Sequence, residues 1–537
     1  MTCKRLPSRA EVSHTGRAAA RCTSLVLLAL TLPACGWFPA VDLAPTYTPP
    51  EYVVPASWRG SSPFVEAKPA DSELRKDWWK LYDDPVLNTL VEQAMAANPD
   101  LQAAAERFVQ ARDAMMKARS QYLPQFGVGF NASRNKQSEE ALFRAPDSPI
   151  QQSTMGFGGI ASWEPDFWSA LRNATRVEVF RAEERAAGFG LARLSLQAEI
   201  ASDYFTLRGY DAQVAIYNQS ITLYKNVLNL VERQFAGKIA SALDVARVES
   251  LLFSTETKLA QIQGQRQITE QAISILLNMA PGTFTIEPVD DLRVATFTIP
   301  QTIPSTLLER RPDIAGMERR MAQANRAIGI ARAAFFPDVA FRLSGGFEDG
   351  LNLIKLANSL WSYGAAVALP VFQGGYRRAQ LQQSWSAYRE TEDLYRSTVL
   401  NAFREVENNL SLTNRLTLAS NRQDAAVGAN FKTQNMTIAL YQGGLASSLE
   451  LIYAQLNTLT ARIDLVAIKA DLLRSSVALM RALGGGWDRK QLPTDDQIQP
   501  FNTFEYVNLD KPTPFVGIDV NAGNNWVNNN LTKPSVP

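Results

Sequence analysis

The sequence FAGKIASALD at residues 235–244 is the one strong break in a stretch, Phe167–Ala280, that contains no proline. On both sides of the break, residues of one helical face recur in steps of three and four. They are Tyr217, Ile221, Tyr224, Leu228, Val231 and Phe235 before it, and Val248, Leu252, Thr255, Leu259, Ile262, Arg266, Thr269, Ile273 and Leu276 after it. Heptad spacing of this kind indicates helices that wind around neighbours. At ~1.5 Å per residue, Ala170 to Phe235 would form a rod of about 100 Å, so we predict a long helical hairpin that turns at Gly237.

The same pattern occurs a second time in the chain. The segment YQGGLASSLE at 441–450 matches FAGKIASALD 206 positions later, and three shorter pairs occur in the same order at similar offsets. These pairs are NPDL at 98–101 with RPDI at 311–314, LP at 123–124 with FP at 336–337, and PDF at 165–167 with PVF at 370–372. Matches in constant order indicate one structural unit used twice. We predict a first repeat at 76–285, a linker at 286–302 and a second repeat at 303–487.

Each repeat is expected to contain a helix, a β-hairpin and a long helical hairpin. The first repeat should have one helix over Pro85–Ser120, a β-hairpin at 124–164 and a helical hairpin at 167–280; the second should have a helix, a β-hairpin at 337–371 and a helical hairpin at 373–485. Strands are predicted because apolar residues alternate with small or polar ones over segments of about ten residues, as in transmembrane strands. The polar segment Arg134–Gln152 is expected to be a surface loop. A small soluble sheet is the alternative; Trp361 and Tyr363, placed at a strand end as interfacial aromatics are, favour the membrane.

The first 34 residues have the features of an export signal, with a basic leader and an apolar core at Ser24–Leu32 that is too short to span a membrane as an anchor. The sequence Leu32-Pro-Ala-Cys35 resembles a bacterial lipobox, in which the cysteine becomes the lipidated first residue. Gly36 follows where an aspartate would argue for the inner membrane, so the outer membrane is expected. Residues 35–75 are proline-rich and should form an extended tether. The tail at 488–537 should wrap the helices or stay partly disordered.

Composition excludes several classes of function. The formal charge of the whole chain is +1, so there is no nucleic-acid footprint. Removal of 1–34 takes away Cys3, Cys22 and the one histidine, His14, and leaves Cys35 as the one cysteine. No disulfide, no Ser-His-Asp triad and no His/Cys metal site can then form. We therefore expect no enzymatic activity, no cofactor and no metal.

Several motifs together resemble the outer-membrane factor (TolC-type) family, in its lipoprotein branch of efflux channels that serve RND-type pumps. They are WWKLYDDP at 78–85, NPDL at 98–101, RRPDI at 310–314, FFPD at 335–338, LPVFQGG at 369–375 and ALGGGW at 482–487. The resemblance covers roughly residues 75 to 490, by our own comparison of the motifs. It implies a mainly α chain with a membrane β-barrel, in which long coiled coils form a helical barrel.

A count of strands supports an assembly. Four strands per chain cannot close a barrel, because the smallest common barrels have about eight, and an open edge in lipid leaves backbone groups unpaired. Chains must therefore share a barrel. The resemblance implies a homotrimer with a 12-stranded barrel. An ordinary helical bundle, the alternative for the helices, does not explain why strands and long helices alternate twice.

The resemblance also places a periplasmic gate at the two hairpin tips. Asp244 and Tyr441 fall on residues that hold the tip shut in the family, and Glu450 falls on a position that forms an acidic ring. Tyr453 stands where some members have a second acid, and Ala446 where some have an arginine. The alternatives are structural: Asp244 and Glu450 could cap helices, and Tyr441 could be a core aromatic.

Small residues at the tips allow close approach of another backbone. They are Gly237, Ala240, Ser241, Gly443, Gly444, Ala446 and Ser447. The resemblance implies that a periplasmic adaptor (membrane fusion) protein docks here, although glycine could simply be needed for the tight turn.

We therefore predict a trimeric channel of the Gram-negative outer membrane, lipid-anchored at Cys35, that conducts small molecules from an adaptor and an inner-membrane RND-type pump to the exterior. It would contact outer-membrane lipid and no nucleic acid. The alternatives are a conduit for type I protein secretion and, from a different class, a lipid-tethered periplasmic coiled-coil scaffold.

Overall fold

The computed structural model describes residues 40–48, 77–138, 149–294, 307–349 and 355–498. The chain divides into two compact units. The first comprises 1–45, 117–175 and 326–384 and holds the strands, and the second comprises 46–116, 176–325 and 385–537. The expected signal peptide, Cys35, most of the tether, part of the linker and the tail beyond 498 lie outside the described residues.

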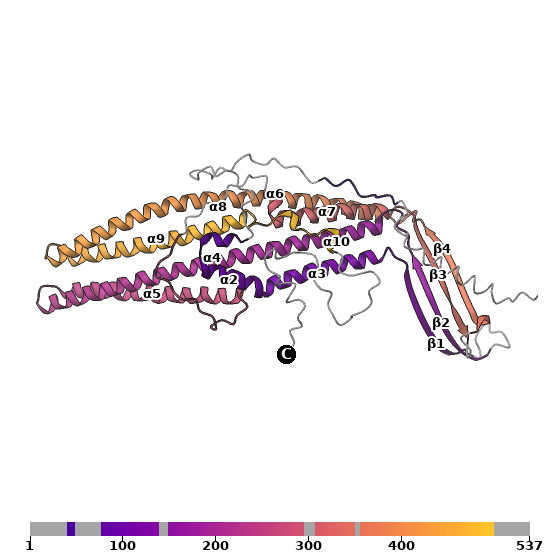
Figure 1. Ribbon diagram of the computed structural model, residues 1–537, viewed down its shortest axis with the longest axis horizontal. Coiled ribbons are helices and arrows are strands. Elements are labelled where there is room, and N and C mark those ends of the chain that lie inside the picture. Colours follow the sequence, from indigo (N-terminus) through magenta and orange to yellow (C-terminus); the bar gives the residue numbers. More distant parts are fainter. Residues whose placement is uncertain (1–39, 49–76, 139–148, 295–306, 350–354, 499–537) are drawn as a thin grey trace, which may run out of the picture. The chain divides into compact units, whose positions relative to one another are not determined.

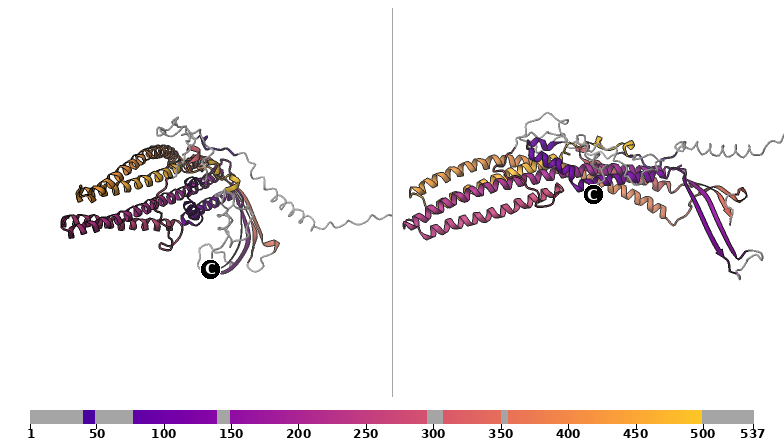
Figure 2. Two further views of the ribbon diagram at one scale, coloured as in Figure 1. Left: turned by 60° about the vertical axis from the view of Figure 1, so that its left-hand side comes forward. Right: turned by 60° about the horizontal axis from the view of Figure 1, so that its bottom comes forward.

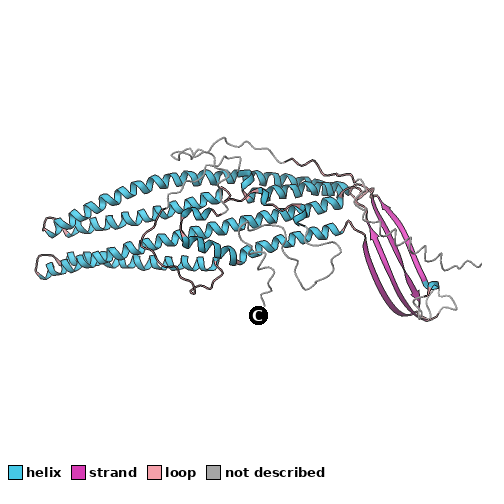
Figure 3. Cartoon of the chain, in the orientation of Figure 1, coloured by secondary structure: helices cyan, strands magenta, loops and turns pink. Residues whose placement is uncertain are grey.

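The first unit contains one antiparallel sheet (Figure 1, Figure 3). Its strands follow chain order and are β1 (Gln125–Lys136), β2 (Gln151–Trp163), β3 (Asp338–Asp349) and β4 (Ser359–Ala368), with a short 3-10 helix, η5 (Leu356–Asn358), before β4. The prediction of four strands in a mainly helical chain is confirmed. The prediction of a loop from Arg134 was wrong at its ends, because β1 and β2 continue into it and the Arg134 guanidinium donates to the Gln151 amide oxygen at 3.0 Å.

The two faces of the sheet differ in chemistry. Cross-strand partners share a face, so Phe126, Ala161, Leu343 and Tyr363 form one row across all four strands. On that face Phe126 and Tyr363 are each 75% exposed. The opposite face is lined mainly by small and polar residues, with Ile160 and Leu360 as its large apolar side chains. There a Cβ on Gly346 would collide with the backbone of β2, so the close approach of β2 and β3 requires glycine.

The second unit is built mainly from long antiparallel helices, and the helix lengths recur. The helices of the described chain are α2 (Pro85–Ala97), α3 (Pro99–Ser120), α4 (Ala170–Ala236), α5 (Ala242–Leu276), α6 (Leu307–Arg310), α7 (Pro312–Ala333), α8 (Tyr376–Gln442), α9 (Ser448–Ala482) and α10 (Asp495–Ile498), with 3-10 helices η3 (Trp78–Tyr82) and η6 (Arg489–Gln491). One end of each of α3, α4, α7 and α8 belongs to the first unit. Both α4 and α8 have 67 residues, and both α5 and α9 have 35. Equal lengths at a constant offset are what the predicted repeat requires. No helix in the described ranges is apolar over a long enough run to cross a bilayer.

In the second unit, α4 with α5 and α8 with α9 form two hairpins that lie side by side with their turns at the same end (Figure 1, Figure 2). Away from these turns, the aromatic side chains of η3 are buried in the core. Trp78 is fully buried and donates from Nε1 to the Gln197 side chain at 3.3 Å, and the Tyr82 hydroxyl lies 2.8 Å from Ser476 Oγ. Trp78 and Trp79 are therefore part of the core.

The single helix expected over Pro85–Ser120 is in fact two helices. Asn98 interrupts it with φ −65° and ψ 123°, which is extended backbone. The cause is Pro99, whose ring disfavours the helical conformation in the residue before it. The Asn98 side chain then accepts from Leu101 N at 2.9 Å and donates to the Leu276 carbonyl at 3.1 Å, so the break also fastens α3 to the end of α5.

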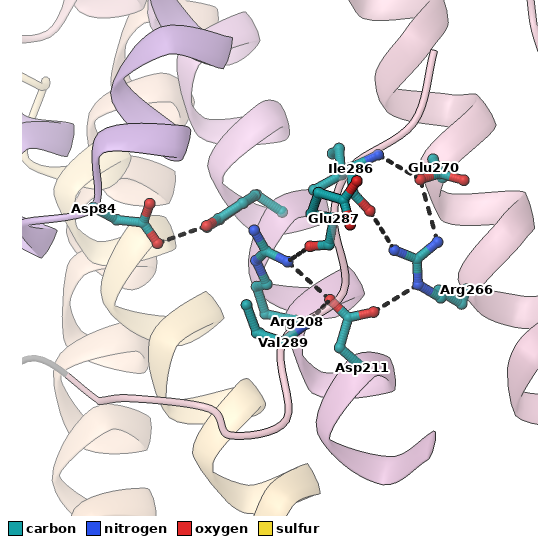
Figure 4. Close-up of polar contacts among 9 residues, drawn as sticks. Asp84, Arg208, Asp211, Arg266, Glu270, Ile286, Glu287 and Val289 are labelled. Atoms are coloured by element: carbon teal, nitrogen blue, oxygen red, sulfur yellow. Dashed lines mark hydrogen bonds and ion pairs between the residues drawn. The ribbon is translucent and has the colours of Figure 1, made fainter. Parts of the chain in front are cut away.

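A buried polar network fixes the segment that leaves the first hairpin (Figure 4). Asp211 on α4 accepts from Arg208 at 2.9 Å and from Arg266 on α5 at 2.6 Å. The two guanidinium groups also donate to the carbonyls of Glu287 and Ile286, both at 2.6 Å. Because both carboxylate oxygens and both carbonyls have donors, burying these charges leaves little unpaired polarity.

Candidate functional site

The turns of the two hairpins have the same backbone design. In the first, Ile239 N donates back to the Gln234 carbonyl at 2.8 Å, and in the second Leu445 N donates to the Leu440 carbonyl at 2.8 Å. Each turn contains one residue in the left-handed region, Lys238 (φ 61°) in the first and Gly444 (φ 73°) in the second. Gly444 thus serves the turn itself, as the simpler explanation of the tip glycines stated.

A capping box begins the returning helix of each hairpin. Ser241 accepts from Asp244 N, and the Asp244 carboxylate accepts from Ser241 N at 3.0 Å. Ser447 and Glu450 repeat the arrangement, with Ser447 N donating to the Glu450 carboxylate at 2.7 Å. Both acids therefore have the capping role given above as the alternative to a gate. Glu450 is also exposed, and its place in an acidic ring stays a prediction.

Asp244 additionally bonds across to the second hairpin. The Ser448 hydroxyl, in the first turn of α9, donates to the Asp244 carboxylate. Close by, the Tyr441 hydroxyl donates to the Gln234 side-chain oxygen at 2.8 Å. A small apolar cluster lies between the tips and consists of Val227, Val231, Val248, Tyr441 and Leu451. We call these two hydrogen bonds and the cluster the tip junction.

The electrostatics of the tip junction follow from these bonds. The Ser448 hydroxyl, followed by the side chain and backbone N–H of Ser241, lowers the pKa of Asp244, and Arg247 at 3.7 Å adds to the effect. Burial, with the nearby Asp244 charge, raises the pKa of Tyr441. Asp244 is therefore ionised and Tyr441 is neutral at physiological pH, so the carboxylate accepts and the phenol donates.

The structure brings two of the four predicted gate residues together. Asp244 and Tyr441 both belong to the tip junction, but each bonds to a third residue and not to the other. Tyr453 is 57% exposed and is not part of the junction. Gln234 and Ser448 were not predicted as partners of these residues. A signal existed, because the repeat places leucine opposite Gln234 and alanine opposite Ser448.

The residues predicted to dock an adaptor divide into two groups. Gly237, Gly443 and Gly444 are exposed, and Ser241 and Ser447 are exposed caps. Ala240 and Ala446 instead pack against the apolar cluster of the tip junction. The most prominent tip residues were not predicted: Ile239 is 81% exposed and Leu445 is 80% exposed, at equivalent positions of the two turns.

Two further expectations concern metal binding and lipidation. No group of three or more His, Cys, Asp or Glu residues that could hold a metal ion occurs in the described part of the chain. The predicted lipidation residue, Cys35, lies outside it.

Comparison with known proteins identifies the architecture. The family model described as outer membrane efflux protein matches residues 90–279 and 303–485. The pyoverdine export outer membrane protein OpmQ of Pseudomonas aeruginosa is 29% identical over 489 residues, which cover 88% of this chain and 99% of OpmQ. The outer membrane protein OprJ of the same species is 28% identical over 472 residues, which cover 87% of this chain and 96% of OprJ.

Solved structures agree with these relatives. The outer-membrane channel OprN matches with a TM-score of 0.76 and 27% identity, over 83% of this chain and 99% of OprN. The outer membrane channel CmeC of Campylobacter jejuni matches with a TM-score of 0.77 over 83% of this chain and 96% of CmeC. Because the sequence identity is only 23%, this structural match shows a shared fold alone.

Proposed function

The chain belongs to the outer membrane efflux protein family, and we propose that three copies of it form one passage for small molecules across the outer membrane. Energy would come from an inner-membrane RND-type pump, joined to the passage by a periplasmic adaptor. We also propose that 76–285 and 303–487 are the two repeats of each chain, which the equal lengths of α4 and α8 and of α5 and α9 support.

The observation that carries this proposal is the four-stranded sheet with two open edges. Within the described chain, β1 pairs with β2 alone and β4 with β3 alone. Each unpaired backbone group in lipid costs several kcal/mol, so a sheet with one apolar face must close on itself or on other copies. Four strands are too few to close alone, whereas three copies supply twelve.

The tip junction is proposed as the resting gate. Two hydrogen bonds and a small apolar cluster are a modest set of contacts compared with the core of a domain. Engagement of the tips by another protein could therefore replace them. The exposed Ile239 and Leu445, one on each tip, offer apolar surface for that adaptor, with the neighbouring glycines leaving room for its backbone.

Lipid anchoring at Cys35 is proposed from the sequence and from the segment that follows it. In the first unit Val41 N donates to the Phe167 carbonyl at 2.9 Å, and Asp42 bonds to Asn173 at 3.0 Å and to Arg326 at 2.9 Å. Cys35 and Val41 are six residue steps apart, and a fully extended chain covers at most ~3.6 Å per step, or about 22 Å. A lipid on Cys35 would therefore stay close to the unit that holds the sheet.

Cross-linking tests the shared barrel. Cysteines at Val128 in β1 and at one of Tyr363, Ala365 or Val367 in β4 should give a covalent trimer on non-reducing gels. Within one chain the two edges are three strand spacings apart, ~14 Å, which exceeds the ~7 Å limit for a disulfide. The single-cysteine parents are the controls. Monomer alone in every pair, with an intact sheet, would refute the shared barrel.

Loss of the tip junction should open the gate. We expect Tyr441→Phe and Ser448→Ala to raise single-channel conductance in planar bilayers, because each variant removes one hydrogen bond of the closed state. A hydrogen bond contributes ~1 kcal/mol, so its loss should shift the closed-to-open equilibrium toward the open state about fivefold. Tyr453→Phe is the matched control and should leave conductance unchanged. Conductance equal to wild type in both junction variants would remove the tip junction from the gate.

The gate should also respond to acid. Hydrogen bonds to the charged form lower the pKa of Asp244 below its ordinary value of about 3.9. The stabilisation of the closed tips by the Asp244 carboxylate is therefore present at neutral pH and is lost as the pH falls through that lowered pKa. Wild-type conductance should rise there, while Asp244→Asn should be high at neutral pH and lack this step. A wild-type step at pH 6 to 7 would contradict the assignment to Asp244.

Apolar contact at the tips should govern binding of the adaptor. We expect Ile239→Gln combined with Leu445→Gln to lower adaptor cross-linking several-fold, because burial of apolar surface drives such association. Leu356→Gln is the control, since Leu356 is 88% exposed but precedes β4. Wild-type yield from the tip variant would exclude this surface.

Lipidation has a direct measurement. Cys35→Ser should abolish incorporation of labelled palmitate while leaving the amount of folded protein in the membrane fraction within about twofold. The expected tolerance follows from the barrel, which is held in the bilayer by its own apolar face. Labelling that persists in Cys35→Ser would show that the lipobox is misassigned.

A further inference from the structure

All charged residues on one face of the sheet belong to a single strand. The side chains of Asp338, Arg342 and Glu348 share a face of β3, because they stand at even positions of a strand with a period of two. The partners of Arg342 are Ser162 on β2 and Gly364 on β4. No other Asp, Glu, Lys or Arg occurs on this face of β1, β2 and β4 within the strands that the structure describes.

Arg342 is the one positive charge in this set. Its side chain is exposed, and its neighbours along the same face are Ala340 and Ser344. It makes no hydrogen bond or ion pair with any of the described residues, so its guanidinium is available to a solute. The acids of β3 are four and six residues away, or about 13 and 20 Å along the strand, beyond the screening length of about 8 Å at physiological ionic strength.

The chemistry of the two faces shows which side Arg342 occupies in a membrane barrel. The opposite face carries Phe126, Val128 and Tyr363, all strongly exposed. An arginine facing lipid near the bilayer midplane costs ~2–4 kcal/mol, whereas the interior of such barrels is polar. Arg342 therefore faces the water-filled passage of the barrel.

We propose that Arg342 favours anions over cations at its own level of the barrel passage. The inference rests on the proposed trimer, in which three copies of Arg342 form one ring of positive charge at a single level. Small neighbours such as Gly364 leave the guanidinium groups uncovered, and low-dielectric walls focus their field into the opening. Carboxylate, sulfonate and phosphate groups are the solutes that a guanidinium binds most strongly, in bidentate pairs, so anionic cargo would be favoured at this level and cations disfavoured.

Reversal potentials in a potassium chloride gradient test the proposal, at low ionic strength where screening is weakest. Arg342→Gln should shift the reversal potential toward that of potassium relative to wild type, and Arg342→Lys should stay close to wild type. Moving the charge two residues along the same face, by Arg342→Gln with Ser344→Arg, should restore the wild-type value. Glu348→Gln should shift it in the opposite direction. A reversal potential in Arg342→Gln equal to wild type overturns the proposal.

Thiol labelling separates failure of this inference from failure of the proposed function. In proteoliposomes, Arg342→Cys should react with a charged, water-soluble thiol reagent, while Leu343→Cys, on the opposite face, should be shielded by lipid. Both are compared with the parent chain. The reverse pattern overturns the barrel orientation and the proposal with it. The expected labelling with an unchanged reversal potential in Arg342→Gln overturns the selectivity alone.

Discussion

The structure depends on one constraint: a β-sheet in lipid cannot leave backbone donors and acceptors without partners. Each strand of the sheet is 10 to 13 residues long, the length that a tilted strand needs to cross a bilayer, and one face is apolar. Nothing in the described chain pairs with the outer edges of β1 and β4. The apolar face of the sheet is therefore suited to lipid, whereas its two edges are not, and this mismatch is the physical basis for proposing an assembly of copies. In the second unit, by contrast, the helices satisfy their backbones internally and face no such requirement.

The two hairpins share a length and a turn design but are fastened differently at the end away from the tips. The first uses the ionic network of Arg208, Asp211 and Arg266, whereas the equivalent positions of the second are Asn414, Thr417 and Leu472. The difference follows from what leaves each hairpin. The segment after α5 presents carbonyls of Ile286 and Glu287 that need donors, and long guanidinium side chains supply them. After α9 the chain turns through three glycines with positive φ and closes its own hydrogen bonds, with Gly485 N donating to the Met480 carbonyl at 3.0 Å.

Sequence predicted what local periodicity and backbone chemistry determine. The heptad step and the absence of proline placed the long helices, and the alternation of Phe126, Val128 and Phe130 with glycines and asparagine placed β1. The break in the helix at Asn98 was not predicted, although Pro99 favours a break there, because the apolar pattern continues on both sides of Asn98. The hydrogen-bond partners of Asp244 and Tyr441 could not be predicted from the sequence, for a different reason. Which side chains face each other across the tip junction depends on the lateral register of two hairpins about 200 residues apart, and no spacing within one helix encodes that register.

Asp244 and Glu450 show how two hairpins of the same design come to make different contacts. Both stand third in the returning helix, and both complete a capping box, so the local stability of the turn accounts for each acid equally. They differ in what the other hairpin offers. Ser448 provides a hydroxyl to Asp244, but the equivalent residue of the first hairpin is Ala242, which can offer nothing to Glu450. The same contrast separates Gln234, which accepts from Tyr441, from its equivalent Leu440. The repeated backbone makes two matching tips, and the positions at which the repeats diverge in polarity are those that join one tip to the other. Divergence between the two hairpins is therefore a better guide to the contacts between the tips than the residues that the hairpins share.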